Sequence, residues 1–177
     1  MVLVLASGRG ERFLASGGQV HKLKALLAGK AVLQHTLDAV RASSLPWHLE
    51  DAGHPGMGDS IAAAVQATAQ SSGWLILPGD LPLIQPDTLR AVAQALTRHA
   101  AVVPVFDGRR GHPVGFSAAC GAALQALKGN QGAAPVVAAY GAMEMIVDDI
   151  GAVTDIDTLD DLAQAEQRLA QRAAGSA

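Results

Sequence analysis

Residues 1–22 read MVLVLASGRGERFLASGGQVHK and join a short apolar run to a loop rich in glycine and cations. The apolar start has the length and composition of a buried parallel strand. Gly8 and Gly10 then allow backbone N–H groups to approach an anion closely. Positive charge for the same anion could come from three nearby side chains, those of Arg9, Arg12 and Lys22. The segment indicates a phosphate site at a strand end, although a strand followed by an ordinary solvated turn would use the same residues.

Composition favours one domain with an aliphatic core. The chain has 177 residues, of which 50% are hydrophobic and only 3% aromatic, as expected for helices packed on a sheet. We expect residues 1–173 to form this domain and residues 174–177 to be a disordered tail. The single cysteine, Cys120, permits no internal disulfide and no cysteine metal cluster, which fits a cytoplasmic location.

Charge and hydropathy argue against two classes of partner. The formal net charge is −3, so general nucleic-acid binding is not expected. A membrane is not expected either, because no apolar run of the sequence approaches spanning length. The charges are nevertheless unevenly placed: residues 1–30 contain five cations and one acid, whereas residues 144–166 contain eight acids and no cation. This distribution suits a site for a polyphosphate and its metal ion.

Apolar runs alternate with segments of helical periodicity along the chain. After the first strand we expect strands or extended pieces at residues 74–78, 101–105, 111–116 and 143–147. Helices are expected at residues 31–42, 61–70, 88–99, 117–127, 133–140 and 158–173, the second of them capped by Asp59 or Ser60. Residues 43–56 are poorly patterned and fit a short edge strand and a loop. The alternation predicts an α/β fold with a mostly parallel sheet covered on both faces.

Polar features follow three of the predicted strands, and we expect them to meet in one crevice because parallel strands end at the same edge of a sheet. They are the glycine-rich loop, Asp80, and the pair Asp155 and Asp157. Asp80 lies between glycine and proline residues directly after a buried strand, which favours a metal or ligand role. Asp157 has an alternative role as the cap of the last helix, since Thr158 and Asp161 match a capping box there. Convergence would supply the cations and carboxylates that metal-dependent chemistry at a nucleotide phosphate requires.

Other phosphate and catalytic motifs do not fit. The loop from Gly8 and Gly10 continues to Phe13, where a dinucleotide fingerprint has Gly or Ala, so a hydride-transfer cofactor is not expected. The sequence contains no GxxxxGK[ST] phosphate loop, no HExxH and no Cys/His spacing of a zinc site. Ser7 and Ser60 do not lie in GxSxG, which argues against a serine hydrolase.

Five segments resemble, in order, the motifs of the MobA-like nucleotidyltransferases, a family that includes the molybdenum cofactor cytidylyl- and guanylyltransferases. They are LASGRGERF at residues 5–13 with Lys22, PGMGDS at 55–60, LPGDLPL at 77–83, GRRGHPV at 108–114 and DIDT at 155–158. The resemblance runs across nearly the whole chain. It implies a three-layer Rossmann-like nucleotidyltransferase fold that is shortened in the region of residues 43–56.

The resemblance also implies a role for each matched position. A nucleoside triphosphate would be bound by Ala6, Ser7, Gly8, Arg9 and Gly10 together with Gly58 and Ser60. The catalytic residues would be Arg12, Lys22 and Asp80, and Mg²⁺ would be held by Asp80 with Asp155 or Asp157. Gly111, His112 and Pro113 would face a phosphorylated acceptor. The implied reaction is an in-line attack of the acceptor phosphate on the α-phosphorus, with release of pyrophosphate.

In such a protein a nucleoside monophosphate would pass from CTP or GTP to an acceptor such as molybdopterin, with a molybdoenzyme maturation protein as a further partner. CMP is favoured over GMP because the surroundings of Ser60 and His112 are closer to the cytidylyl branch, whereas Ser7 is uninformative. Two alternatives remain open. One is the same chemistry on a sugar or polyol phosphate. The other is a non-catalytic nucleotide- or cofactor-binding protein, which the shortened region makes plausible.

Overall fold

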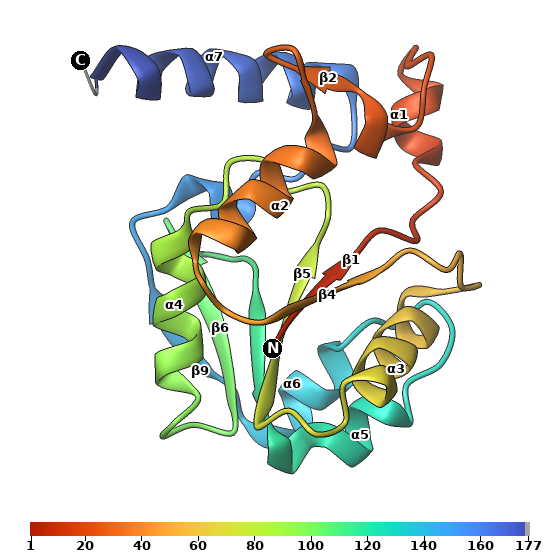
Figure 1. Ribbon diagram of the computed structural model, residues 1–177, viewed down its shortest axis with the longest axis vertical. Helices are drawn as coiled ribbons and strands as arrows, with labels where there is room; N and C mark the ends of the chain where they lie inside the picture. Colours follow the sequence, from red (N-terminus) through yellow and green to blue (C-terminus); the bar gives the residue numbers. More distant parts are fainter. Residues whose placement is uncertain (176–177) are drawn as a thin grey trace.

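The computed structural model describes residues 1–175 and contains a seven-stranded sheet with helices on both faces (Figure 1). The strands of this sheet are β1 (Val2–Leu5), β4 (Trp47–Glu50), β5 (Gly73–Pro78), β6 (Ala101–Phe106), β7 (Arg109–Arg110), β8 (Val114–Ser117) and β9 (Met143–Ile146). A separate ribbon is formed by β2 (Leu26–Leu27) and β3 (Lys30–Ala31). The helices are α1 (Glu11–Ala15), α2 (Val32–Ala42), α3 (Met57–Ala67), α4 (Pro86–Ala95), α5 (Gly121–Gln125), α6 (Ala134–Tyr140) and α7 (Leu159–Gly175). Short 3₁₀ helices are η1 (Lys22–Lys24), η2 (Ala118–Cys120) and η3 (Ile150–Val153).

The main sheet has the strand order β4-β1-β5-β8-β6-β7, and β9 pairs with β6. β1 is parallel to both β4 and β5, and β6 is parallel to β9. β8 runs antiparallel to its neighbours β5 and β6, and the two-residue β7 runs antiparallel to β6. The predicted α/β fold with a mostly parallel sheet is therefore confirmed. The loop after β1 leaves the sheet between the ends of two parallel neighbours, which is where ligands bind in open α/β sheets.

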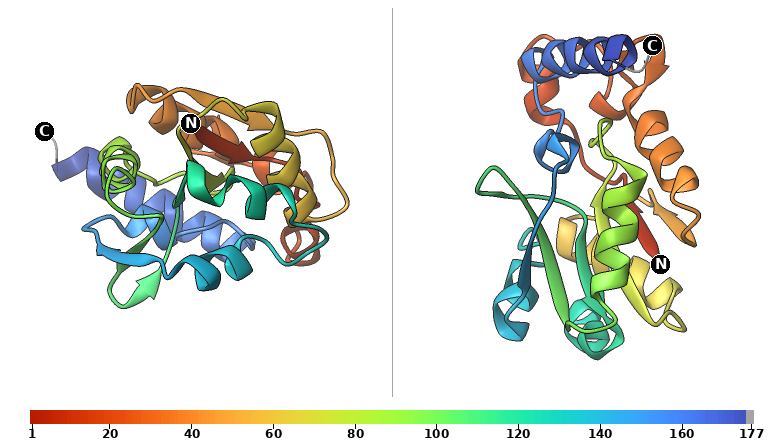
Figure 2. Two further views of the ribbon diagram at one scale, coloured as in Figure 1. Left: turned by 90° about the horizontal axis from the view of Figure 1, so that it is seen from below. Right: turned by 90° about the vertical axis from the view of Figure 1, so that its left-hand side faces the viewer.

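Each face of the sheet has its own apolar cluster, because successive side chains of a buried strand point to opposite faces. On one face, Val2 and Val4 of β1 pack with residues of α2 and α4. On the other face, Leu3 and Leu5 pack with residues of α3, α5 and α6. Figure 2 shows these layers from two further directions. The three layers correspond to the Rossmann-like arrangement expected from the sequence.

A third apolar cluster lies at the carboxyl end of the central strands, beneath α7. Phe13 of α1 and Leu23 of η1 pack there with Ile156 and with Ala165 of α7. Figure 1 shows α7 crossing this end of the molecule, beside α1 and β2. The cluster joins the cationic N-terminal segment to the acidic C-terminal segment, so charges that are distant in sequence become neighbours.

Residues 43–56 form the short edge strand β4 and a loop, as their weak pattern predicted. The guanidinium of Arg41 lies 5.6 Å from the ring centroid of Trp47 and covers the start of the strand. At its other end, the Glu50 carbonyl accepts a hydrogen bond from the Ala6 N–H at 2.8 Å. This short segment therefore forms a wall directly beside the glycine-rich loop.

The start of α3 differs from the sequence-based expectation. The helix begins at Met57 after Gly56, and no side chain caps it, so the prediction that Asp59 or Ser60 is its N-cap is wrong. Asp59 instead accepts a hydrogen bond from the Gly129 N–H at 3.0 Å. The physical reason is that the loop after α5, which is distant in sequence, packs on the first turn of α3. Its Gly129 N–H takes the Asp59 carboxylate that would otherwise have capped the helix.

The last helix also extends further than expected. α7 continues to Gly175, past the predicted end at residue 173. The remainder of the expected tail, residues 176–177, lies outside the described residues. Neither α7 nor any other helix within residues 1–175 has the length and apolar character needed to cross a membrane.

Candidate active site

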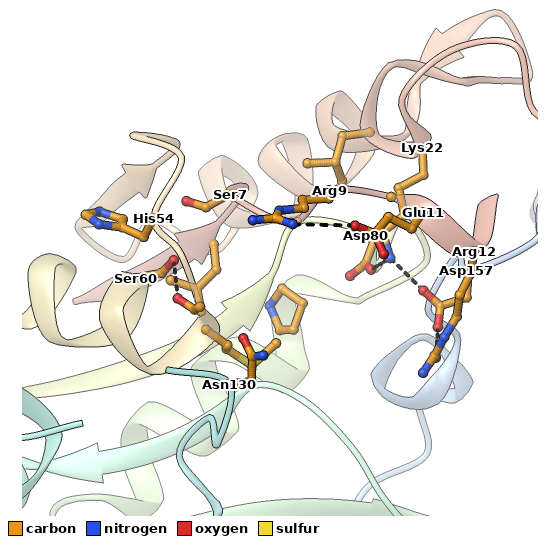
Figure 3. A pocket seen from close by; sticks show the side chains of 18 of the residues that line it. Ser7, Arg9, Glu11, Arg12, Lys22, His54, Ser60, Asp80, Asn130 and Asp157 are labelled. Carbon is orange, nitrogen blue, oxygen red and sulfur yellow. Dashed lines mark hydrogen bonds and ion pairs between the residues drawn. The ribbon is translucent and has the colours of Figure 1, made fainter. Parts of the chain in front are cut away.

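A cavity of about 520 Å³ opens at the carboxyl ends of β1 and β5, and we call it the first cavity. The glycine-rich loop forms one side, and the start of α3 forms the opposite side (Figure 3). The predicted nucleotide-binding residues that line it are Ser7, Gly8, Arg9, Gly10 and Ser60. The residues that sequence analysis assigned to one ligand thus surround one space.

A second cavity of about 410 Å³ adjoins the first and opens toward the β6–β7 hairpin. Residues that line both cavities are Arg12, Lys22, Met57, Pro78, Asp80 and Asp157. Residues that line the second cavity and not the first include Arg109, Arg110, Gly111, His112 and Asp155. The predicted catalytic residues therefore lie where the cavities meet, with predicted nucleotide-binding residues on one side and predicted acceptor-binding residues on the other.

Lys22 lies on this shared wall and pairs with two carboxylates. Its Nζ is 2.6 Å from Asp80 Oδ2 and 2.6 Å from Asp157 Oδ1. Arg12 Nη1 is 2.9 Å from the other oxygen of Asp157, and Figure 3 shows these side chains pointing toward one another. Because the side chains of Lys22 and Asp80 are only 14% and 12% exposed, each charge depends on its partner. We call these four residues the ion-pair centre.

The backbone holds Asp80 in place on both sides. The Gly79 N–H donates to the Leu5 carbonyl at 2.9 Å and joins the ends of β5 and β1. Thr36 of α2 donates its hydroxyl to the Gly79 carbonyl at 2.9 Å. The Ile156 N–H donates to the Asp80 carbonyl at 3.0 Å. Asp80 is thus fixed at the strand end, as its sequence context predicted, and the segment that carries Asp157 is attached directly to it.

The alternative role of Asp157 as the cap of α7 is excluded, because Thr158 and Asp161 cap this helix. Thr158 Oγ1 accepts a hydrogen bond from the Asp161 N–H at 3.2 Å, and the Asp161 carboxylate accepts one from the Thr158 N–H at 2.8 Å. This reciprocal pair is the predicted capping box. The carboxylate of Asp157 is left to the ion-pair centre.

Electrostatic interactions shift the pKa values of the site in different directions. Burial alone would lower the pKa of Lys22, but the carboxylates of Asp80 and Asp157 outweigh burial and raise it. Burial alone would raise the pKa of Asp157, but hydrogen bonds and charges from Lys22 and Arg12 outweigh burial and lower it. Desolvation raises the pKa of Asp155, and repulsion from Asp80 and Asp157 adds to the effect. An additional cation beside these carboxylates would relieve that repulsion.

Asp80 offers an unused oxygen for such a cation. Its Oδ1 is buried and has no hydrogen-bond partner among residues 1–175, which is costly for an ionised oxygen unless a ligand binds it. No group of three or more His, Cys, Asp or Glu side chains in the described chain is placed so that it could hold a metal ion by itself. Mg²⁺ characteristically uses one or two carboxylates together with water and substrate phosphates. Asp80 with Asp155 or Asp157 fits that mode of binding.

The glycine-rich loop is closed by a residue that sequence analysis did not identify. Gly10 has a φ of 65°, which favours glycine, and a side chain there would meet the His21 ring at 3.2 Å. His21 Nε2 lies 2.6 Å from the Gly8 carbonyl oxygen and ties the two ends of the loop together. Nothing local in the sequence marks this contact, since it depends on how the intervening residues fold back.

His54, at the end of the first cavity away from the ion-pair centre, was also missed (Figure 3). Its Nε2 lies 3.0 Å from Oε1 of Glu50, a residue that is only 7% exposed and also accepts from the Ala52 N–H at 3.2 Å. Burial alone would raise the pKa of Glu50, but these hydrogen bonds and one from His48 outweigh burial and lower it. The spacing His48, Glu50, His54 around a strand end was the signal available in the sequence.

Two glycines allow the loop after α5 to reach the first cavity. A Cβ at Gly56 would lie 2.3 Å from the backbone of Gly129, and one at Gly58 would lie 2.8 Å from the backbone of Lys128. The Gly58 N–H donates to the Gly129 carbonyl at 2.7 Å. This close approach brings Asn130, another residue that sequence analysis missed, into the lining of the cavity.

Gly111 and His112 enter the second cavity just after β7. The Gly111 N–H donates to the Pro104 carbonyl at 2.8 Å, and the His112 N–H donates to the Ala152 carbonyl at 2.8 Å. A Cβ at Gly111 would lie 2.3 Å from the Ala152 oxygen, so glycine is required for this packing. Burial outweighs nearby carboxylates and lowers the pKa of His112. Its Nδ1 is buried and has no hydrogen-bond partner in the described part of the chain.

All of the predicted site residues lie in the described chain, and three of them line neither cavity. The Ala6 N–H is already donated to the Glu50 carbonyl, so it is not available to a phosphate. Gly58 packs against the loop after α5 and shapes the site without lining it. Pro113 is buried. The structure brings the remaining predicted residues to one or both cavities.

Comparison with protein families identifies the class. The MobA-like NTP transferase domain matches residues 40–144, which is more than half of the chain. The chain therefore belongs to this family of nucleotidyltransferases. The resemblance drawn from the five sequence motifs is confirmed.

One curated relative is the bifunctional protein GlmU of Desulfitobacterium hafniense, with 28% identity over 135 residues. The match covers 64% of this chain and 29% of the GlmU chain. The chain thus spans less than a third of the length of the curated relatives it matches.

Solved structures share the fold over nearly the whole chain. Rv0371c from Mycobacterium tuberculosis is 23% identical with a TM-score of 0.77, and the match covers 94% of this chain and 96% of that one. A complex of Rv0371c with manganese gives 22% identity, a TM-score of 0.72, and coverage of 94% and 97%. Molybdopterin-guanine dinucleotide biosynthesis protein A from Archaeoglobus fulgidus gives 18% identity, a TM-score of 0.70, and coverage of 96% and 98%. At these identities the likeness establishes the nucleotidyltransferase fold.

Replacing Lys22 by Met should lower the free energy of unfolding at pH 7 by about 2 kcal/mol, because the carboxylates of Asp80 and Asp157 lose their shared cation. The pH dependence follows from Asp157. Its pKa in the folded protein lies below the ordinary value of 3.8, so the stabilisation is present above that value and is lost as pH falls through the lowered pKa. The difference between wild type and Lys22→Met should therefore be largest near pH 7 and shrink as the pH falls below 3.8.

Urea unfolding followed across this pH range measures the difference. Lys24→Met is the matched control, since Lys24 is an exposed lysine on the same 3₁₀ helix. It should change stability little at any pH. An equal loss in both variants, or a loss at Lys22 that does not depend on pH, would contradict the role given to the ion-pair centre.

Proposed function

We propose that the chain transfers a nucleoside monophosphate from a nucleoside triphosphate to a phosphorylated acceptor, with release of pyrophosphate. The observation that carries this proposal is the ion-pair centre at the junction of the two cavities. Transfer between two ligands needs a separate space for each and a set of shared groups at the reacting phosphorus. Arg12, Lys22, Asp80 and Asp157 are suited to be those groups.

The first cavity would hold the nucleotide. Gly8 and Gly10 allow the backbone to approach the triphosphate. Arg9 can also bind it, because its side chain is 76% exposed and its ion pair with Glu11, at 3.7 Å, is a weak surface pair. The base and ribose would lie toward Ser60 and His54, away from the ion-pair centre. Bound in this way, the α-phosphorus would face the shared wall.

Charge neutralisation and alignment would supply most of the rate enhancement, so no side-chain nucleophile is required. Lys22 and Arg12 would stabilise negative charge on the transferring and leaving phosphates. Asp80, with Asp155 or Asp157, would hold a divalent metal ion, which as a Lewis acid withdraws charge from phosphoryl oxygens. We propose Mg²⁺ as this ion, and the manganese complex of Rv0371c supports a divalent cation in proteins of this fold.

For the substrates, we propose CTP in preference to GTP and a molybdopterin-type acceptor. The sequence around Ser60 and His112 supports the base preference, and the fold likeness to molybdopterin-guanine dinucleotide biosynthesis protein A supports the acceptor class. A molybdoenzyme maturation protein as partner and a cytoplasmic location belong to the same proposal. A sugar or polyol phosphate is the alternative acceptor.

Replacing Asp80 by Asn should lower the rate of pyrophosphate release by about 100-fold or more, because the amide keeps the size of the side chain but loses its charge. The measurement is pyrophosphate release with Mg²⁺, CTP and molybdopterin, and thermal unfolding checks that the variant is folded. Asp160→Asn is the control, since Asp160 is exposed on α7 and lines neither cavity. It should keep the wild-type rate.

A wild-type protein that binds CTP yet releases no pyrophosphate with any phosphorylated acceptor would contradict the transfer proposal. That result would instead support a nucleotide-binding protein that has kept the fold without the reaction. A normal rate in Asp80→Asn would contradict the metal-binding role of this residue alone.

The base preference can be measured by thermal shift with CTP, GTP, ATP and UTP in the presence of Mg²⁺. A ligand present at 100 times its Kd raises the free energy of unfolding by about 2.7 kcal/mol, so a preferred nucleotide gives the largest increase in Tm at equal concentration. We expect the largest increase with CTP. A larger increase with GTP would overturn the proposed preference for CMP transfer.

A further inference from the structure

The cations of the second cavity are not equally available to a ligand. Lys22 and Arg12 pair with carboxylates of the ion-pair centre. Arg110 pairs with Glu144 of β9 at 2.6 Å. Arg109 differs from these, because within residues 1–175 its guanidinium makes no ion pair and has one hydrogen bond, from Nη2 to the Val153 carbonyl at 3.3 Å.

The hairpin fixes where Arg109 stands. Its two-residue turn, Asp107 and Gly108, has positive φ values of 48° and 73°, as tight hairpins require. Arg109 is paired with Phe106 across the hairpin, and the packing of Gly111 against Ala152 anchors the base of the same hairpin. A guanidinium has five N–H donors, so the bond to Val153 leaves most of them for a ligand.

The second cavity needs a cation that is not already paired. Its wall contains the carboxylates of Asp80, Asp155 and Asp157, and a phosphate entering the cavity would be repelled by them. Arg109 has no acidic partner within residues 1–175, so its guanidinium can bind a phosphate with two parallel hydrogen bonds.

We propose that Arg109 binds the phosphate of the acceptor in the second cavity and selects acceptors that carry a phosphate dianion over neutral alcohols. This inference rests on the proposed function, and it gives a binding role to a residue of the GRRGHPV segment to which the sequence analysis assigned none. Arg109 would hold the acceptor phosphate, while the ion-pair centre acts on the nucleotide. The matched residue is Arg110, which is next in sequence and lines the same cavity but is held by Glu144.

The test uses the full chain with Mg²⁺ and the α,β-methylene analogue of the preferred nucleoside triphosphate, which fills the first cavity and cannot be cleaved at the α-phosphorus. Inorganic phosphate is then titrated by calorimetry. We expect saturable binding to the wild type, a loss of at least about tenfold in Arg109→Gln, and less than about threefold in Arg110→Gln. Arg109→Lys, which keeps the charge but not the paired geometry, should lie between wild type and Arg109→Gln.

Equal phosphate affinity in wild type and Arg109→Gln, or no binding to the wild type, would overturn the proposal. A loss seen in Lys22→Met but not in Arg109→Gln would assign the phosphate to the ion-pair centre and also overturn it. If the nucleotide analogue fails to bind, the proposed function fails separately, and the same titration without the analogue still compares the variants. If Arg109→Gln is unfolded by thermal scanning, Arg109→Lys decides the outcome.

Discussion

The contact of Lys22 with Asp80 and Asp157 is the interaction on which the rest of the site depends. Two ion pairs, each with an N–O distance of 2.6 Å, join chain segments that are far apart in sequence. Carboxylates with little exposure to water are stable only when a cation is placed correctly beside them. The sheet supplies that placement, because Asp80 follows a central strand and the Ile156 N–H attaches the segment that carries Asp157 to the Asp80 carbonyl.

This constraint explains the division of the site into two spaces. The ion-pair centre occupies the shared wall, so ligands in the two cavities would meet over the same charges. Each cavity is then completed by close backbone packing. Gly56 and Gly58 admit the loop that carries Asn130 on one side, and Gly111 admits the η3 segment on the other. A methyl group at any of these glycines would push a wall of the site outward.

Sequence alone could predict the elements whose signals are local. The apolar run of β1 and the periodicity of α2 do not depend on distant residues, and Asp80 could be placed because parallel strands end together. His21 and Asn130 could not be found, since each is placed by packing between segments that are not adjacent in sequence. The wrong cap predicted for α3 has the same cause, because Asp59 bonds to a loop that follows α5. His54 contacts Glu50 only four residues away, so its spacing was a usable signal that the sequence analysis missed.

The most direct test of the ion-pair centre is electron paramagnetic resonance of Mn²⁺ bound to the protein with the α,β-methylene analogue of CTP. The expected spectrum shows coupling between Mn²⁺ and nucleotide phosphorus, and Asp80→Asn should weaken Mn²⁺ binding by at least about tenfold in the same complex. Equal Mn²⁺ affinity in both proteins, or protein-bound Mn²⁺ without phosphorus coupling, would contradict the claim that these carboxylates join the metal ion to the triphosphate.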